Sequence, residues 1–188
     1  MFITGSSGDD VNEYSLSTAF DLSSAVYAGN SERFAVGTQE TDPQGITFNN
    51  DGTKMFIVGS TGDDVNEYSL STAFDVSTSS YAQLFSVQSQ ETTPTGIAFN
   101  NAGTKMFIVG STGDDVNEYS LSTAFDVSTA SYVQNFSVQS QETVPAGLTF
   151  NSDGTKMFIV GSTGDDVNEY SLDNPAVQTV CQLSLIHI

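Results

Sequence analysis

Gly-Asp-Asp-Val-Asn-Glu-Tyr-Ser-Leu occurs four times in this 188-residue chain without a single change, at residues 8–16, 62–70, 113–121 and 164–172. Four methionines take one repeat position around these copies and are spaced by 54, 51 and 51 residues: Met1, Met55, Met106 and Met157. Units 55–105 and 106–156 differ at only nine of 51 positions. The chain is therefore an array of near-identical units of about fifty residues, in which each unit packs against its neighbours.

Each unit contains four apolar runs separated by turn signals, a pattern typical of short antiparallel strands. In one unit the runs are residues 96–99, 105–109, 115–121 and 132–138. Asn50-Asp51-Gly52 and Ser152-Asp153-Gly154 predict hairpin turns, because Asp bonds its own backbone and Gly accepts a positive φ. In the connection 122–131 we expect Phe125 to fill an apolar gap and Asp126 to bond the following turn.

Four strands in about fifty residues predict an all-β fold, a β-propeller of four-stranded antiparallel blades. We expect 14 strands in 3.5 to 4 blades over residues 1–172: a partial blade 1–42, blades 43–93 and 94–144, and a partial blade 145–172. Residues 173–188 diverge and predict a last strand at 177–183 followed by non-native sequence. Met1 falls inside a unit, so we expect a fragment, an arc of a larger propeller; a closed four-blade ring is the alternative.

Residues 94–110 and 43–59 carry a family resemblance. They read Pro-x-Gly-Ile-x-Phe-Asn-Asn-x-Gly-Thr-Lys-Met-Phe-Ile-Val-Gly, which resembles the YVTN-type and lactonase-like β-propeller repeat. Residues 118–132 are similar to repeats in uncharacterised environmental, metagenomic and phage-associated propellers. The resemblance implies a propeller of six to eight blades. It leaves function open, because the repeat occurs in enzymes, surface-layer proteins and viral structural proteins.

The chain is strongly acidic, with 23 acidic residues against four basic ones and a formal net charge of -19. This charge repels phosphate backbones and anionic lipids, so we expect neither nucleic-acid nor membrane partners. No run of 18 apolar residues occurs, so membrane insertion is not predicted. Cys181 is the single cysteine, which excludes an internal disulfide.

Repeated carboxylates are the candidate binding groups. In a propeller the loops after each second strand and the crossings between blades emerge on one face. The loops would present Asp63, Asp64, Asp114, Asp115, Asp165 and Asp166, and the crossings Glu40, Glu91 and Glu142. Oxygen ligands suit Ca²⁺, so the aspartates are candidate metal ligands and the glutamates a candidate ligand rim. The alternative is solvated loops in which one Asp caps a turn.

Catalytic signatures are missing from the sequence. The single histidine, His187, lies in the divergent tail, so a Ser-His-Asp triad is excluded within this chain. Paired carboxylates in identical loops give no reason for the separated pKa values that glycosidase chemistry needs. The repeated tyrosines, which could also form an aromatic ring for sugars, are better explained by packing between blades: Tyr14, Tyr68, Tyr119 and Tyr170.

The sequence therefore predicts a non-catalytic β-propeller interaction or structural module with a protein or carbohydrate ligand. The resemblance favours an extracellular or virion-associated protein. The alternatives are a Ca²⁺-dependent ligand-binding propeller and a fragment of a lactonase-like hydrolase.

Overall fold

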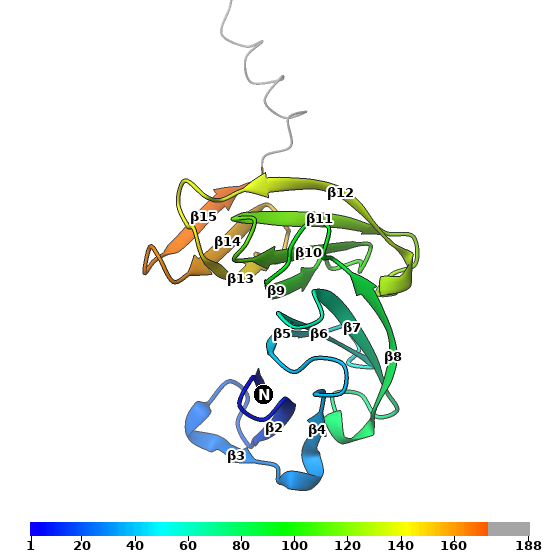
Figure 1. Cartoon of the computed structure of the whole chain (residues 1–188). Coiled ribbons are helices and arrows are strands. Elements are labelled where there is room, and N and C mark those ends of the chain that lie inside the picture. The colour runs from blue at the N-terminus through cyan, green and yellow to red at the C-terminus, as the bar shows by residue number, and fades with distance from the viewer. Residues whose placement is uncertain (173–188) are drawn as a thin grey trace, which may run out of the picture.

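Each predicted blade forms one antiparallel sheet in the computed structural model, which describes residues 1–172 (Figure 1). We number the sheets blades 1 to 4. Blade 1 contains β1 (Phe2–Gly5), β2 (Asp10–Leu16), β3 (Ala25–Tyr27) and β4 (Arg33–Ala35), and blade 2 contains β5 (Pro43–Phe48), β6 (Lys54–Gly59), β7 (Asp64–Leu70) and β8 (Ser79–Ser86). Blade 3 contains β9 (Pro94–Phe99), β10 (Lys105–Gly110), β11 (Asp115–Leu121) and β12 (Ala130–Ser137), and blade 4 contains β13 (Pro145–Phe150), β14 (Lys156–Gly161) and β15 (Val167–Ser171).

Apolar side chains on both faces of each sheet form the core, because successive residues of a strand point to opposite faces. On β6, Met55 and Ile57 pack in a buried cluster with Val11 of blade 1. Phe56 and Val58, which alternate with them, pack in a second cluster with Ile97 of blade 3. The core is therefore a series of layers between adjacent blades, and no blade covers its own faces.

The innermost strands arrange the blades around a common centre (Figure 1). β1 contacts β5, β5 contacts β9, and β9 contacts β13. The all-β propeller architecture with four antiparallel blades is confirmed for the described residues. Whether the intact protein carries further blades stays a prediction.

The strand count differs from the expected 14, because the outer strand of blade 1 is divided in two and the described part of the chain has fifteen strands. β3 and β4 both pair with β2. Between them lie Gly29, whose φ is 111°, and the 3₁₀ helix η2 (Asn30–Glu32). The first unit is three residues longer than the others. Its chain therefore stops pairing with β2 after Tyr27 and pairs with it again from Arg33.

A 3₁₀ turn follows the Asp-Val-Asn-Glu-Tyr-Ser-Leu strand in blades 1, 2 and 3: η1 (Leu22–Ser24) after β2, η3 (Val76–Thr78) after β7 and η4 (Val127–Thr129) after β11. In blade 3 the Phe125 ring lies 5.3 Å from the Phe99 ring and covers Gly103, where a Cβ would overlap it. The Asp126 carboxylate accepts a 3.1 Å hydrogen bond from the Ser128 N–H. Both predictions for this connection are confirmed.

The predicted strand at 177–183, Cys181 and His187 lie outside the described residues. Within residues 1–172, no helix is long and apolar enough to cross a membrane.

Candidate functional site

The first aspartate of each Gly-Asp-Asp loop ends a turn between the second and third strands of its unit. Asp63, Asp114 and Asp165 have φ values of 53°, 53° and 54°. The short side chain of Asp tolerates this left-handed conformation and can bond nearby groups. Asp63 accepts a 3.0 Å hydrogen bond from the Gln88 side chain, and Asp114 accepts one of 2.9 Å from Gln139.

The second aspartate begins the next strand and points into the protein in blades 2 and 3. Asp64 and Asp115 are buried, and each accepts a hydrogen bond from the asparagine two residues later, at 2.6 Å from Asn66 and 2.7 Å from Asn117. Burial raises the pKa of both carboxyls, and the bonds from the asparagines partly oppose this shift. In blade 4, Asp166 is exposed and bonds Asn168 at 2.9 Å.

The three glutamates of the crossings are almost completely buried, with exposed fractions of 0%, 1% and 0% for Glu40, Glu91 and Glu142. The Glu91 carboxylate accepts hydrogen bonds from the N–H groups of Thr93 at 2.8 Å, and of Thr112 and Gly113 at 3.2 Å each. Glu40 and Glu142 repeat this pattern. The Val144 N–H, with those of Gly164 and Thr163, lowers the pKa of Glu142.

The structure therefore brings the predicted aspartates and glutamates together blade by blade. Each glutamate fastens a crossing to the Gly-Asp-Asp loop of the following blade, and its oxygens are occupied by backbone donors. Glu40 accepts a 3.2 Å hydrogen bond from the Gly62 N–H, two residues before Asp64. The pKa of Asp64 is raised mainly by burial and also by the charge of Glu40. Calcium binding by the aspartates and ligand binding by the glutamates stay predictions.

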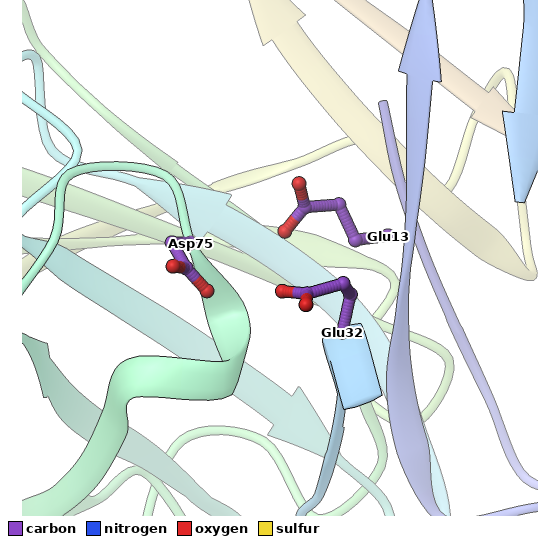
Figure 2. Close-up of side chains that lie close together, drawn as sticks. All are labelled: Glu13, Glu32 and Asp75. Atoms are coloured by element: carbon purple, nitrogen blue, oxygen red, sulfur yellow. The ribbon is translucent and has the colours of Figure 1, made fainter. Parts of the chain in front are cut away.

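A different acidic cluster, absent from the sequence predictions, lies between blades 1 and 2. Glu13 on β2, Glu32 on η2 and Asp75 before η3 point toward one another (Figure 2). One carboxylate oxygen of each lies within 4.8 Å of the others, and all three side chains are half-buried. The pKa of Glu13 is raised, mainly by burial. The hydrogen bond from the Val76 N–H opposes this shift, and the charges of Asp75 and Glu32 add to it.

The equivalent place between blades 2 and 3 shows which residue was replaced to make this cluster acidic. There Gln83 donates to Glu67 at 2.9 Å and to Asp126 at 2.8 Å, and Lys54 contacts Glu67 at 2.6 Å. By strand register Glu32 takes the place of Gln83, because Phe34 and Phe85 pair with Val11 and Val65. Counting back from Phe34 in the sequence would have identified the acidic replacement.

The groups between blades 2 and 3 hold a polypeptide turn. Glu67 accepts a 3.0 Å hydrogen bond from the Val127 N–H, and Lys54 donates to the Phe125 carbonyl at 2.7 Å. Gln83 bonds the Asp126 side chain. We call Lys54, Glu67 and Gln83 a polar triad and residues 125–127 a Phe-Asp-Val turn. Three side chains of one blade thus bind the backbone and the carboxylate of a turn from the next blade.

A second polar triad is present on blade 3 without such a turn among the described residues. Lys105 contacts Glu118 at 2.6 Å and Gln134 donates to Glu118 at 2.8 Å. Burial opposes ionisation of Glu118, but the hydrogen bonds from Lys105 and Gln134 outweigh it and lower its pKa. The triad lines a cleft of about 770 Å³ between blades 3 and 4, together with Phe150, Gly154 and Leu172.

Comparisons with known proteins identify the fold class. No protein-family model and no curated protein matches the sequence. Solved structures do match. A Lactobacillus plantarum protein is 13% identical with a TM-score of 0.64, over 93% of this chain and 48% of the other. A Bacteroides fragilis protein named a "putative 6-phosphogluconolactonase" is 13% identical with a TM-score of 0.60, over 89% and 46%. A protein of unknown function from Desulfotomaculum acetoxidans is 17% identical with a TM-score of 0.59, over 91% and 50%.

These similarities establish a β-propeller fold and include the lactonase-like type. The chain spans about half the length of the matching structures. At such low identity the similarity shows only that this chain shares the fold of these proteins. Their activities cannot be inferred for it.

Proposed function

We propose that this part of the propeller is a non-catalytic protein-interaction module, whose cleft between blades 3 and 4 binds a polypeptide turn. One observation carries the proposal. Lys105, Glu118 and Gln134 have the internal hydrogen bonds of Lys54, Glu67 and Gln83, and the latter three hold a turn of this same chain. A triad already held in its bound geometry needs little ordering when a ligand arrives.

The burial of the tyrosines favours a protein ligand over a carbohydrate. Tyr68 and Tyr119 are both fully buried, with an exposed fraction of 0%, and pack edge-on against Phe34 and Phe85 of the preceding blades. Their faces are thus covered by protein, whereas sugar binding uses exposed aromatic faces. The cleft instead offers a carboxylate, an ammonium group and an amide, which match the N–H, carbonyl and side-chain groups of a peptide turn.

Peptide binding tests this proposal. A fluorescein-labelled peptide with the sequence of residues 122–130, Ser-Thr-Ala-Phe-Asp-Val-Ser-Thr-Ala, is titrated with the full chain and fluorescence anisotropy is measured. We expect saturable binding, weakened about tenfold or more by Glu118→Gln, because one charge-assisted hydrogen bond contributes about 1.5–3 kcal/mol. Lys156→Ala is the matched control, since Lys156 pairs with Glu169 outside the cleft. Absence of binding, or equal loss in both variants, contradicts the proposal.

The non-catalytic part of the proposal is tested separately. The chain is incubated with δ-lactones, 6-phosphogluconolactone included, with and without divalent metal ions. We expect hydrolysis at the rate of buffer alone. Turnover above that rate would favour the lactonase-like alternative. The extracellular or virion-associated location stays a prediction.

Calcium dependence is the other alternative, and thermal unfolding decides it. A ligand that binds only the folded state raises the melting temperature. Millimolar CaCl₂ is therefore compared with EDTA and with NaCl of equal ionic strength, because the charge of -19 responds to any salt. A rise beyond the NaCl control supports a calcium site, and Asp64→Asn and Glu32→Gln then distinguish the loops from the cluster between blades 1 and 2. Equal melting temperatures in CaCl₂ and in NaCl of the same ionic strength contradict it.

A further inference from the structure

In blades 1 and 3, a side chain of the outer strand binds the second carboxylate oxygen of the buried aspartate. On β4, Arg33 contacts Asp10 Oδ2 at 3.1 Å. On β12, Asn135 donates to Asp115 Oδ2. Both aspartates are almost completely shielded from water, so each blade supplies a donor to an oxygen that solvent can no longer fully satisfy.

Blade 2 has no donor at this position. In each blade the outer-strand residue lies opposite the asparagine of the repeat: Arg33 opposite Asn12, Leu84 opposite Asn66 and Asn135 opposite Asn117. A leucine side chain cannot donate a hydrogen bond. Within residues 1–172, Asp64 bonds Asn66 at 2.6 Å through Oδ1 alone, and its Oδ2 has no partner. The oxygen that the other two blades satisfy is therefore open in blade 2.

Two more polar atoms lack a partner on the same face of β7. Asp64, Asn66 and Tyr68 alternate along the strand and lie on the face that packs against blade 1. Asn66 Oδ1 and the Tyr68 hydroxyl are buried without a hydrogen-bond partner in the described part of the chain, and both residues are 0% exposed. Tyr119, the equivalent tyrosine of blade 3, donates to Gln90 at 3.4 Å. Buried polar atoms are rarely left unsatisfied, so these atoms indicate a ligand.

The chemistry of the three unpartnered atoms favours a cation. They are a carboxylate oxygen, an amide oxygen and a phenol oxygen, which hard cations bind. Glu40 adds a second negative charge to the loop, where it accepts from the Gly62 N–H at 3.2 Å. In blade 1 the equivalent position already holds a cationic group, the guanidinium of Arg33.

We propose that blade 2 binds a calcium ion through Asp64 Oδ2, with Asn66 Oδ1 and the Tyr68 hydroxyl as further oxygen partners and water completing the coordination. Asp64 keeps an exposed fraction of 8%, so the ion can reach it from solvent. Blades 1 and 3 do not share the site, because Arg33 and Asn135 occupy the corresponding oxygen. The inference is independent of the proposed peptide cleft, which lies between blades 3 and 4.

Terbium luminescence tests the inference, because Tb³⁺ replaces Ca²⁺ and is sensitised by a nearby tyrosine. The chain has no tryptophan, and Tyr68 lies at the site. Tb³⁺ is added to the full chain in roughly 0.15 M KCl, which screens the surface carboxylates, and is then displaced with CaCl₂ or MgCl₂. We expect saturable luminescence that Ca²⁺ displaces at lower concentration than Mg²⁺, since Mg²⁺ gives up its water reluctantly.

Two substitutions exchange the blades' roles. Leu84→Asn gives Asp64 the donor that blade 3 has, and Leu84 is 47% exposed, so the fold tolerates the change. We expect it to weaken calcium binding about tenfold or more, because the competing hydrogen bond must first be broken. Val133→Asn is the matched control, an outer-strand apolar residue that is 49% exposed. Conversely, Asn135→Leu removes the donor from Asp115, and we expect it to add a second calcium site.

The outcomes are decisive in both directions. Circular dichroism first verifies that each variant is folded, and because the two substitutions act on different blades, either one alone tests the comparison. Luminescence that Ca²⁺ does not displace from the wild type would mean that water fills the site, and overturns the inference. Equal calcium affinity in the wild type and Leu84→Asn would assign the ions to surface carboxylates and overturns it too, as does an unchanged number of sites in Asn135→Leu.

Discussion

At the scale of single residues, the left-handed aspartates differ in how their strain is compensated. Asp63 gains a hydrogen bond from Gln88, whereas in the described part of the chain no glutamine side chain reaches Asp165. A left-handed conformation costs an L-residue roughly 1–2 kcal/mol, less for Asp, and costs glycine almost nothing.

We therefore expect Asp165→Gly to raise the free energy of unfolding by about 0.5 kcal/mol. Asp63→Gly is the matched control. It also loses a hydrogen bond, so its free energy of unfolding should rise less or not at all. Urea unfolding followed by circular dichroism measures both. A larger gain for Asp63→Gly would contradict the strain argument.

The acidic cluster between blades 1 and 2 supplies a second prediction. Gln at position 32 can donate to both Glu13 and Asp75, as Gln83 donates to Glu67 and Asp126. We expect Glu32→Gln to raise the free energy of unfolding by about 1 kcal/mol at pH 7.

The gain should depend on pH with a defined sign. The pKa of Glu13 is raised in the folded protein, so the folded state holds that proton more tightly than the unfolded chain. Ionisation of Glu13 therefore destabilises the fold above its folded pKa, and this penalty disappears as the pH falls through that pKa. The advantage of Glu32→Gln should shrink below about pH 5, where carboxylates take up protons. A gain that is constant from pH 7 to pH 4 would contradict the assignment.

At the scale of elements, each buried glutamate connects a crossing between blades to a Gly-Asp-Asp loop through hydrogen bonds. Glu91 uses both carboxylate oxygens to accept from backbone N–H groups. In Glu91→Gln one oxygen becomes an NH₂ group, which faces N–H donors and leaves them unsatisfied.

We expect Glu91→Gln to lower the free energy of unfolding by about 1.5–3 kcal/mol. Glu169→Gln is the control, because Glu169 is exposed and, within residues 1–172, forms only a surface ion pair with Lys156, worth about 0–1 kcal/mol. Denaturant unfolding of the two variants compares them. Similar stabilities would show that the backbone hydrogen bonds of Glu91 contribute little.

The strands could be predicted from the sequence because their signals are local. The apolar run within residues 54–59 and the Asp51-Gly52 turn together specify a hairpin, and the repeat period specifies the blade. The division of β3 from β4 was missed, since three inserted residues carry no indication of where the ladder breaks. The burial of Glu91 could not be predicted either, because a glutamate in a polar segment is expected to be solvated until its backbone hydrogen-bond partners are known.

The candidate site could be predicted only in part. The sequence predicted that Asp64 and Glu40 lie in one loop system, and the hydrogen bond from the Gly62 N–H to Glu40 places them there. The polar triad lay beyond reach, because Lys105, Glu118 and Gln134 come from three strands and acquire meaning only from the strand register. The function proposed for it comes from comparing two blades of the same molecule.

At the scale of the whole molecule, charge is the dominant long-range force. A net charge of -19 on 188 residues repels itself in the compact state, and salt screens this repulsion. We expect the melting temperature to rise by roughly 3 °C or more as NaCl increases from about 10 mM to about 500 mM. Differential scanning calorimetry measures it, with sucrose of equal osmolality as the control. A fall in the melting temperature would mean that ion pairs such as Lys54–Glu67 outweigh the repulsion.

The hydrogen bonds between hairpins have a consequence for inheritance. Asn50 donates to the carbonyl of Asn101, and Asn101 donates to the carbonyl of Ser152, each time across an interval of 51 residues. Unequal recombination that removes or adds one whole unit would give each surviving hairpin an equivalent partner at the same interval. Blade number can therefore vary between descendants of one gene without new hydrogen bonds between hairpins having to evolve.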